Sequence, residues 1–120
     1  MNHAIALSAA ETEQVRDLRN RLGRRAVSAA AQATLGNAFL QLCGRVGIVV
    51  DEGAPEMTPA EIVRTAADAD MAALGRLAGA LKRLKTRAPE AWPAAVALGA
   101  PQAVLSRRLA LAGREPAVEA

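Results

Sequence analysis

Apolar residues recur every three or four positions along most of the chain, and this is the spacing of one face of an α-helix. Val15, Leu18 and Leu22 establish the pattern in the first part of the sequence, and it continues as far as Val46. Glycine weakens a helix, so a break could fall near Gly36. The pattern therefore predicts either one long, kinked helix or two helices separated near Gly36, and we expect the single helix.

Two short motifs mark the beginnings of helices. Ser8 with Glu11, and Thr58 with Glu61, have the spacing of a capping box, in which each side chain bonds the main-chain amide of the other residue. Pro59 follows Thr58 at the first helical position, where proline has no amide hydrogen to lose and its fixed φ suits a helix. We expect one helix to begin at each motif.

A second long helical segment is expected at 58–87, after a loop at 51–57 that contains both Gly and Pro. Gly75 and Gly79 lie four apart in this segment and would let another backbone approach closely. The two segments predict a long antiparallel hairpin over 1–88, which would oligomerise because two helices alone bury too little surface. The residues expected in helix packing or oligomer contacts are Leu18, Leu22, Leu74, Gly75, Gly79 and Leu81.

Proline and glycine divide the C-terminal region into two short helices. Pro93 and Pro101 can each begin a helix, and Gly99 can end the first of them. We expect a helical pair at 89–113 and a disordered tail at 114–120. The complete prediction is an all-α protein in which a long antiparallel helical hairpin is followed by two short C-terminal helices.

The composition also favours an all-α fold, because alanine, leucine and arginine are abundant and aromatic residues make up only 2% of the chain. The net charge is +3, with acidic residues concentrated at 51–70 and basic residues clustered before and after that block. Such clusters are compatible with nucleic-acid binding, and equally with ordinary solvated helix faces.

Residue types that support catalysis or metal binding are sparse. Cys43 is the only cysteine and His3 the only histidine, and Cys43 lies in an apolar stretch where a buried, inert thiol is expected. Asp68 and Asp70, two apart on a helix, point in different directions and do not form a carboxylate pair. We expect a protein that is not an enzyme, with no catalytic residues, no cofactor and no metal site.

A membrane-spanning helix at 26–50 is not expected either, although Arg45 is the only charged residue there. Polar residues recur about every four positions through this segment and form one polar stripe, which suits a partly exposed helix. The first residues lack the basic region of a signal peptide, so a cytoplasmic protein is expected.

The stretch AAVALGAPQAVLSRRLALAG (94–113) raises a more specific possibility. Its residues 94–110 resemble the helix-turn-helix motif of bacterial and phage DNA-binding proteins. In that family a small residue on the first helix faces the second, and a hydrophobic residue precedes a turn glycine, which Ala95, Leu98 and Gly99 match. The second helix of the family often reads Gln, two residues, an aliphatic residue, then Ser-Arg, as does the segment 102–107.

This resemblance implies that Gln102, Ser106 and Arg107 face the major groove, where Gln can bond adenine and Arg can bond guanine. Arg108 stands where the family usually buries an aliphatic residue, and we count it with the basic residues available for DNA. The overall plan is loosely similar to phage-like small terminase subunits, which combine such a motif with an oligomeric helical hairpin. The expected DNA contacts are Gln102, Ser106, Arg107, Arg108, Lys82, Arg83, Lys85 and Arg87.

Two functions follow from these patterns. The first is a small DNA-binding protein, either a regulator or a DNA-packaging small terminase subunit, that forms homo-oligomers and binds double-stranded DNA. The alternative is a helical adaptor or structural protein that binds another protein and not DNA. Basic residues at 82–87 and 107–108 that are exposed together on one face would favour DNA. If they are scattered, or paired with Asp68, Asp70 and Glu56, the adaptor is favoured.

Overall fold

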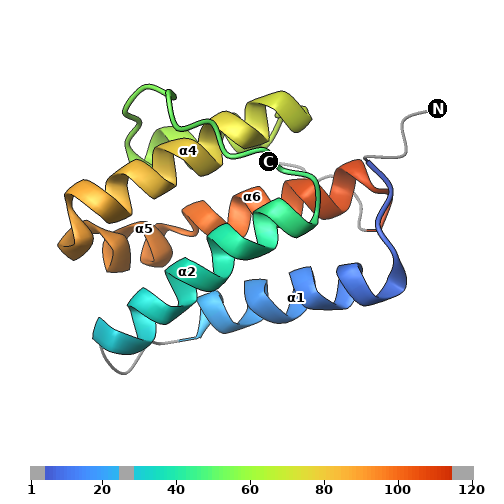
Figure 1. The fold of residues 1–120 in the computed structure, drawn as a ribbon, viewed down its shortest axis with the longest axis horizontal. Coiled ribbons are helices and arrows are strands. Elements are labelled where there is room, and N and C mark those ends of the chain that lie inside the picture. Colours follow the sequence, from blue (N-terminus) through green and yellow to red (C-terminus); the bar gives the residue numbers. More distant parts are fainter. Residues whose placement is uncertain (1–4, 25–28, 115–120) are drawn as a thin grey trace.

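The computed structural model describes residues 5–24 and 29–114, and within them every regular element is a helix (Figure 1). The predicted all-α class is confirmed. Its α-helices are α1 (Ala9–Gly23), α2 (Ala29–Arg45), α3 (Pro59–Ala66), α4 (Met71–Arg87), α5 (Trp92–Leu98) and α6 (Ala100–Leu111), and a short 3₁₀ helix, η1 (Pro89–Ala91), precedes α5. His3 and residues 115–120 of the expected tail lie outside the described residues.

Helix α6 is the central element of the fold. It packs against α1, α3, α4 and α5, and in Figure 1 it runs between α1 and α4. Its Val104, Leu105 and Leu109 are fully buried in the same apolar cluster as Val15 of α1 and Leu77 of α4. The expected separation of a hairpin core (1–88) from a C-terminal helical pair (89–113) is therefore not observed, because both parts share one core.

The expected single helix over the first part of the chain is wrong, and so is the alternative break near Gly36. Helix α1 ends at Gly23, and Arg24 is already in an extended conformation. Helix α2 passes through Gly36 without a break. A Cβ at this position would collide with the stem of Lys85 and press on the ring of Trp92, so Gly36 allows close packing against these side chains.

The second expected helix is also divided, into α3 and α4. Both predicted capping boxes are present, at Ser8 with Glu11 and at Thr58 with Glu61, so the two predicted helix starts are confirmed. Helix α4 has a start of its own, because Asp70 is extended and its carboxylate accepts a hydrogen bond from the amide of Ala73 at 2.8 Å. The expected hairpin of two uninterrupted helices is therefore replaced by four shorter helices, of which α1, α3 and α4 pack against α6.

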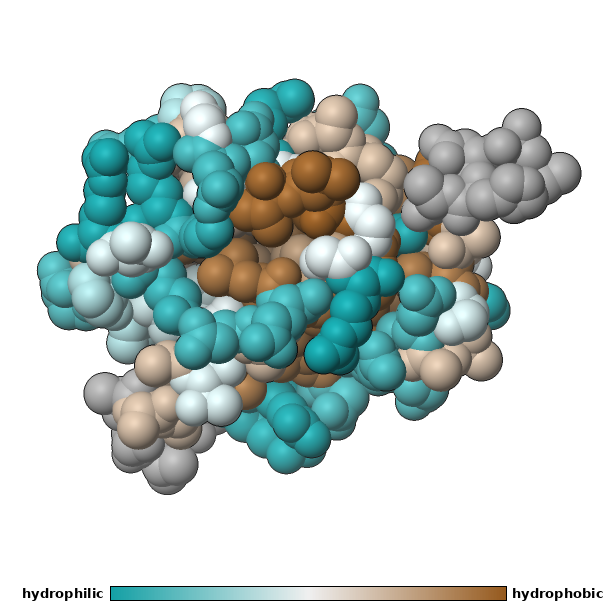
Figure 2. All heavy atoms as spheres, viewed as in Figure 1, coloured by the Kyte–Doolittle hydropathy of each residue, from teal (hydrophilic) through white to brown (hydrophobic). Residues whose placement is uncertain are grey.

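Gly75 and Gly79 do allow a close backbone approach, as expected from their spacing. The approaching backbone is the extended segment after α2, whose Asp51 amide bonds the carbonyl oxygen of Gly75 at 3.0 Å. A Cβ at Gly75 or Gly79 would overlap the carbonyl oxygen of Val49 or Asp51. Figure 2 shows apolar surface where this segment crosses α4, and the side chain of Val49 is 81% exposed there.

The other residues expected in packing or oligomer contacts, Leu18, Leu22, Leu74 and Leu81, are likewise buried within one chain. Leu18 and Leu22 lie on the inner face of α1, and Leu74 and Leu81 lie on the inner face of α4. Packing within the monomer thus accounts for the pattern on which the oligomer was predicted.

Candidate functional site

Arg108 is not available to DNA, and its assignment as a DNA contact is corrected by its position. The residue is 0% exposed, and its Nε donates to the carbonyl oxygen of Val46 while a terminal nitrogen donates to that of Ile5, both at 2.7 Å. Burial lowers the pKa of the guanidinium, and the nearby Glu11 carboxylate acts in the opposite direction. Arg108 thus supports the main chain just beyond the end of α2 from inside the core, as cationic side chains do at helix C-termini.

Gln102 and Arg107 use polar atoms of their side chains to join α6 to other parts of the fold. The amide nitrogen of Gln102 donates to the carbonyl oxygens of Leu22 at 3.2 Å and Val96 at 3.0 Å. Nε of Arg107 donates to the carbonyl oxygen of Ala69 at 2.8 Å, which lies between α3 and α4. Base contacts by Gln102 would therefore compete with hydrogen bonds that stabilise the fold.

Ser106, the third residue expected in the major groove, is partly buried on α6. Its hydroxyl accepts a hydrogen bond from Arg19 of α1 at 3.4 Å. This contact with α6 gives Arg19 a role within the fold that the sequence did not indicate.

The basic residues at the end of α4 are engaged mostly by the acidic loop at 51–57. Lys82 forms an ion pair with Glu52, which lowers the pKa of that carboxyl, and Arg83 donates to the carbonyl oxygen of Glu52 at 3.3 Å. Arg87 pairs with Glu56 at 3.3 Å. The fourth residue, Lys85, donates to Asn37 of α2 at 2.9 Å. Exposed pairs of this kind contribute little to stability, but they place a carboxylate next to Lys82 and Arg87, which were expected to contact phosphate.

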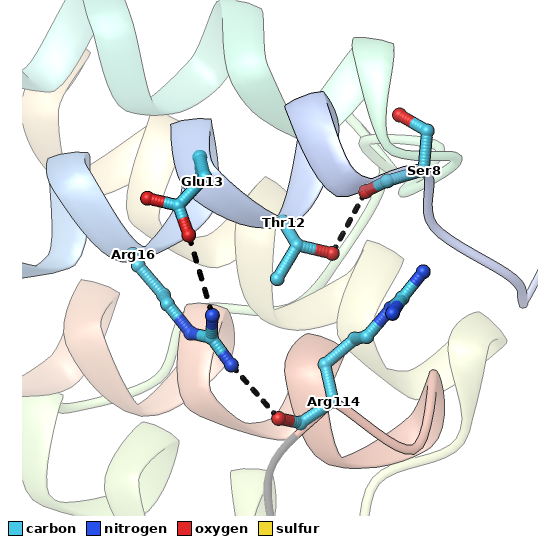
Figure 3. Close-up of polar contacts among 5 residues, drawn as sticks. All are labelled: Ser8, Thr12, Glu13, Arg16 and Arg114. Carbon is cyan, nitrogen blue, oxygen red and sulfur yellow. Dashed lines mark hydrogen bonds and ion pairs between the residues drawn. The ribbon is translucent and has the colours of Figure 1, made fainter.

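Basic residues also join the start of α1 to the end of α6 (Figure 3). Arg16 bridges the carboxylate of Glu13 at 3.4 Å and the carbonyl oxygen of Arg114 at 2.9 Å. Arg114 in turn donates to the carbonyl oxygen of Leu7. The two contacts of Arg114 join segments about a hundred positions apart in sequence, and local sequence patterns do not reveal them.

The surface left open on α6 borders a groove beside α3. This α3–α6 groove has a volume of about 460 Å³. Ala66 is buried and Arg64 is exposed, so alanine forms the floor of the groove and arginine lies at its mouth. Of the predicted DNA contacts, Ser106 and Arg107 line it. The complete lining is Val63, Arg64, Ala66, Ala67, Ala103, Ser106, Arg107 and Ala110.

The alanines of this groove were not predicted as site residues from the sequence. Ala103, Ser106 and Ala110 follow one another at spacings of three and four, which puts them on one face of α6. This stripe of small residues was a usable signal, but alanine is so frequent in the chain that the stripe did not stand out. Its meaning depends on α3 lying opposite, and only the fold supplies that neighbour.

The described residues provide neither an accessible thiol nor a metal site. Cys43 is completely buried, and burial raises the pKa of its thiol to about 12. Among the described residues no cluster of His, Cys, Asp or Glu is large enough to hold a metal ion. Within the same part of the chain, the helices are too short or too polar to cross a lipid bilayer.

Comparisons with known proteins give no match: no family model, no curated protein and no solved structure is significantly similar to this chain.

Proposed function

We propose that this protein is a helical adaptor that binds another protein, and not DNA, through the α3–α6 groove. The observation that carries the proposal is the character of the open surface of α6, where small residues line an apolar hollow. A recognition helix has to enter a DNA major groove about 12 Å wide with one face towards the bases. Helix α6 instead has α1, α3, α4 and α5 packed around it.

The dimensions of the groove suit a helix from a partner. From Ala103 to Ala110 the lining covers two turns of α6, a length of about 10 Å at the helical rise per residue. Small side chains on two adjacent helices let the backbone of a third approach closely. Partner helices that bind in this way place residues at i, i+3, i+4 and i+7 into an apolar groove.

The distribution of charge also supports a protein partner. Affinity for DNA comes mainly from many contacts between basic residues and phosphates. Lys82 and Arg87 are paired with acidic side chains, and Arg108 is in the core. Arg87 forms an ion pair with Glu56, and pairing with this residue is one of the features expected of an adaptor.

The test is a selection of amphipathic helices of mixed charge, displayed as a library, against the purified protein. We expect helices that bind the natural chain and lose binding to Ala67→Trp, which fills the groove at an exposed position. Ala72→Trp, at an exposed position of α4 away from the groove, is the matched control and should leave binding unchanged. Circular dichroism checks that both variants fold.

Fluorescence anisotropy with random double-stranded DNA tests the alternative function, DNA binding. For DNA-binding proteins that contact several phosphates, affinity falls by about a thousandfold or more between low and moderate salt. We expect no such binding here. A selection that yields no groove-dependent helix, or steeply salt-dependent DNA binding, would overturn the proposal.

A further inference from the structure

The two charged residues of the α3–α6 groove are both arginines, one on each wall. Arg64 comes from α3 and is exposed, and Arg107 comes from α6 and is partly buried. Arg107 uses its Nε for the carbonyl oxygen of Ala69, and its two terminal nitrogens have no hydrogen-bond partner among the described residues. No aspartate or glutamate is among the described residues that line the groove.

Neighbouring carboxylates form no ion pair with either arginine among the described residues. Glu61, one turn before Arg64, accepts the amide hydrogen of Thr58 in the capping box, and this cap is the main reason why the pKa of its carboxyl is lowered, with a smaller contribution from the charge of Arg64. Asp68, one turn after Arg64, is exposed and forms no ion pair with it among the residues that the structure describes. The groove therefore combines an apolar floor with positive charge on both walls.

From this arrangement we propose that the groove binds an amphipathic helix whose small apolar face is flanked by carboxylates on both edges. The apolar face would pack on Ala66 and Ala103, and the flanking carboxylates would pair with Arg64 and Arg107. Guanidinium groups bind carboxylates through two parallel hydrogen bonds, which favours an acidic partner over a neutral one of the same shape. This inference depends on the proposed adaptor function and specifies the chemistry of the partner.

The experiment compares two synthetic helices of about five turns that share one face of alanine and leucine. One helix carries glutamate at the positions that flank this face, and the other carries lysine there. Fluorescence anisotropy should show the glutamate helix binding at least about tenfold more tightly, with a preference that shrinks as salt increases. Arg64→Glu should abolish the preference, whereas Arg76→Glu, an exposed site on α4 outside the groove, should preserve it.

The possible results separate this inference from the adaptor proposal. If both helices bound equally well and both lost binding to the Ala67→Trp variant, the inference of an acidic partner would be wrong. The proposed adaptor function would still hold. Binding of neither helix, together with failure of the library selection, would overturn both. If sedimentation showed a dimer that Ala67→Trp dissociates, a second copy would occupy the groove and this inference would also be wrong. Arg107→Gln gives an independent check, because it should weaken the glutamate helix while leaving the lysine helix unaffected.

Discussion

The guanidinium of Arg108 reaches from the centre of α6 to the carbonyl oxygen of Val46, 2.7 Å from its Nε, just beyond the end of α2. A second hydrogen bond of the same length joins it to Ile5, before α1. One buried side chain thus fixes the main chain at two points far from it in sequence. A residue that was counted among the DNA contacts because it is basic is instead part of the core.

Replacing Arg108 with methionine should destabilise the protein by about 2–4 kcal/mol, because a similar stem remains while two carbonyl oxygens lose their donor. Urea unfolding followed by the fluorescence of Trp92, the only tryptophan and 2% exposed, measures the change. Arg76→Met, on the exposed face of α4, should alter the free energy of unfolding by less than about 0.5 kcal/mol. Equal effects of the two substitutions would mean that Arg108 is not in the core.

Gly79→Ala should destabilise the fold by about 1–3 kcal/mol, since its methyl group would overlap the carbonyl oxygen of Asp51. An exposed helical glycine behaves in the opposite way. Gly44→Ala, where an added Cβ meets nothing within 4 Å, should stabilise the protein by up to about 1 kcal/mol. Thermal and urea unfolding of the two variants measure these changes in stability. If both substitutions stabilised the protein, the result would contradict the close crossing of the 48–51 segment over α4.

The thiol of Cys43 should make stability fall with pH in alkaline solution. Its pKa is about 12 in the folded protein against an ordinary value of 9.0, so the unfolded chain ionises first. The buried, protonated thiol therefore makes its full contribution to the free energy of unfolding below pH 9.0. This contribution is lost as the pH rises towards about 12. Cys43→Ala should flatten this part of the dependence of unfolding free energy on pH. An unchanged slope, or rapid reaction of the native thiol with a disulfide reagent at pH 8, would show that the thiol is accessible.

Asp70→Ala should cost about 1 kcal/mol, because the amide of Ala73 loses its capping oxygen at the start of α4. Asp70→Asn keeps an oxygen that can cap and should cost much less. The unfolding free energies of the two variants, measured side by side, give the comparison. Identical losses would indicate that the aspartate acts through its charge and not through the cap.

The sequence predicted those features of the fold that depend on neighbours in the chain. The helical spacing gave the all-α class, and the reciprocal side chains of Ser8 with Glu11 and Thr58 with Glu61 marked two helix starts correctly. The start of α4 had the same kind of signal in Asp70, but its position in ADAD directed attention to paired carboxylates. Gly36 looked like a break because glycine weakens helices, whereas its role depends on Trp92, which is remote in sequence.

The arrangement of the helices around α6 could not be derived in the same way. The polar residues of α6 do not gather on one face, and Arg108 is expected at the surface by its residue type alone. Only the carbonyl oxygens of Ile5 and Val46 make it a core residue, and both are contributed by other segments. The α3–α6 groove likewise depends on the pairing of two helices that are separated by α4 and α5 in sequence.

Native-state hydrogen exchange tests the central claim, the position of α6, most directly. If α6 is the core of one cooperative fold, the amides of Val104, Leu105 and Leu109 should exchange as slowly as those of Leu77 and Leu81 in α4, at the rate of global unfolding. Exchange of α6 that is much faster than exchange of α4 would contradict the account. It would mean that the C-terminal pair opens separately from the core, as a helix free to bind in the major groove of DNA would.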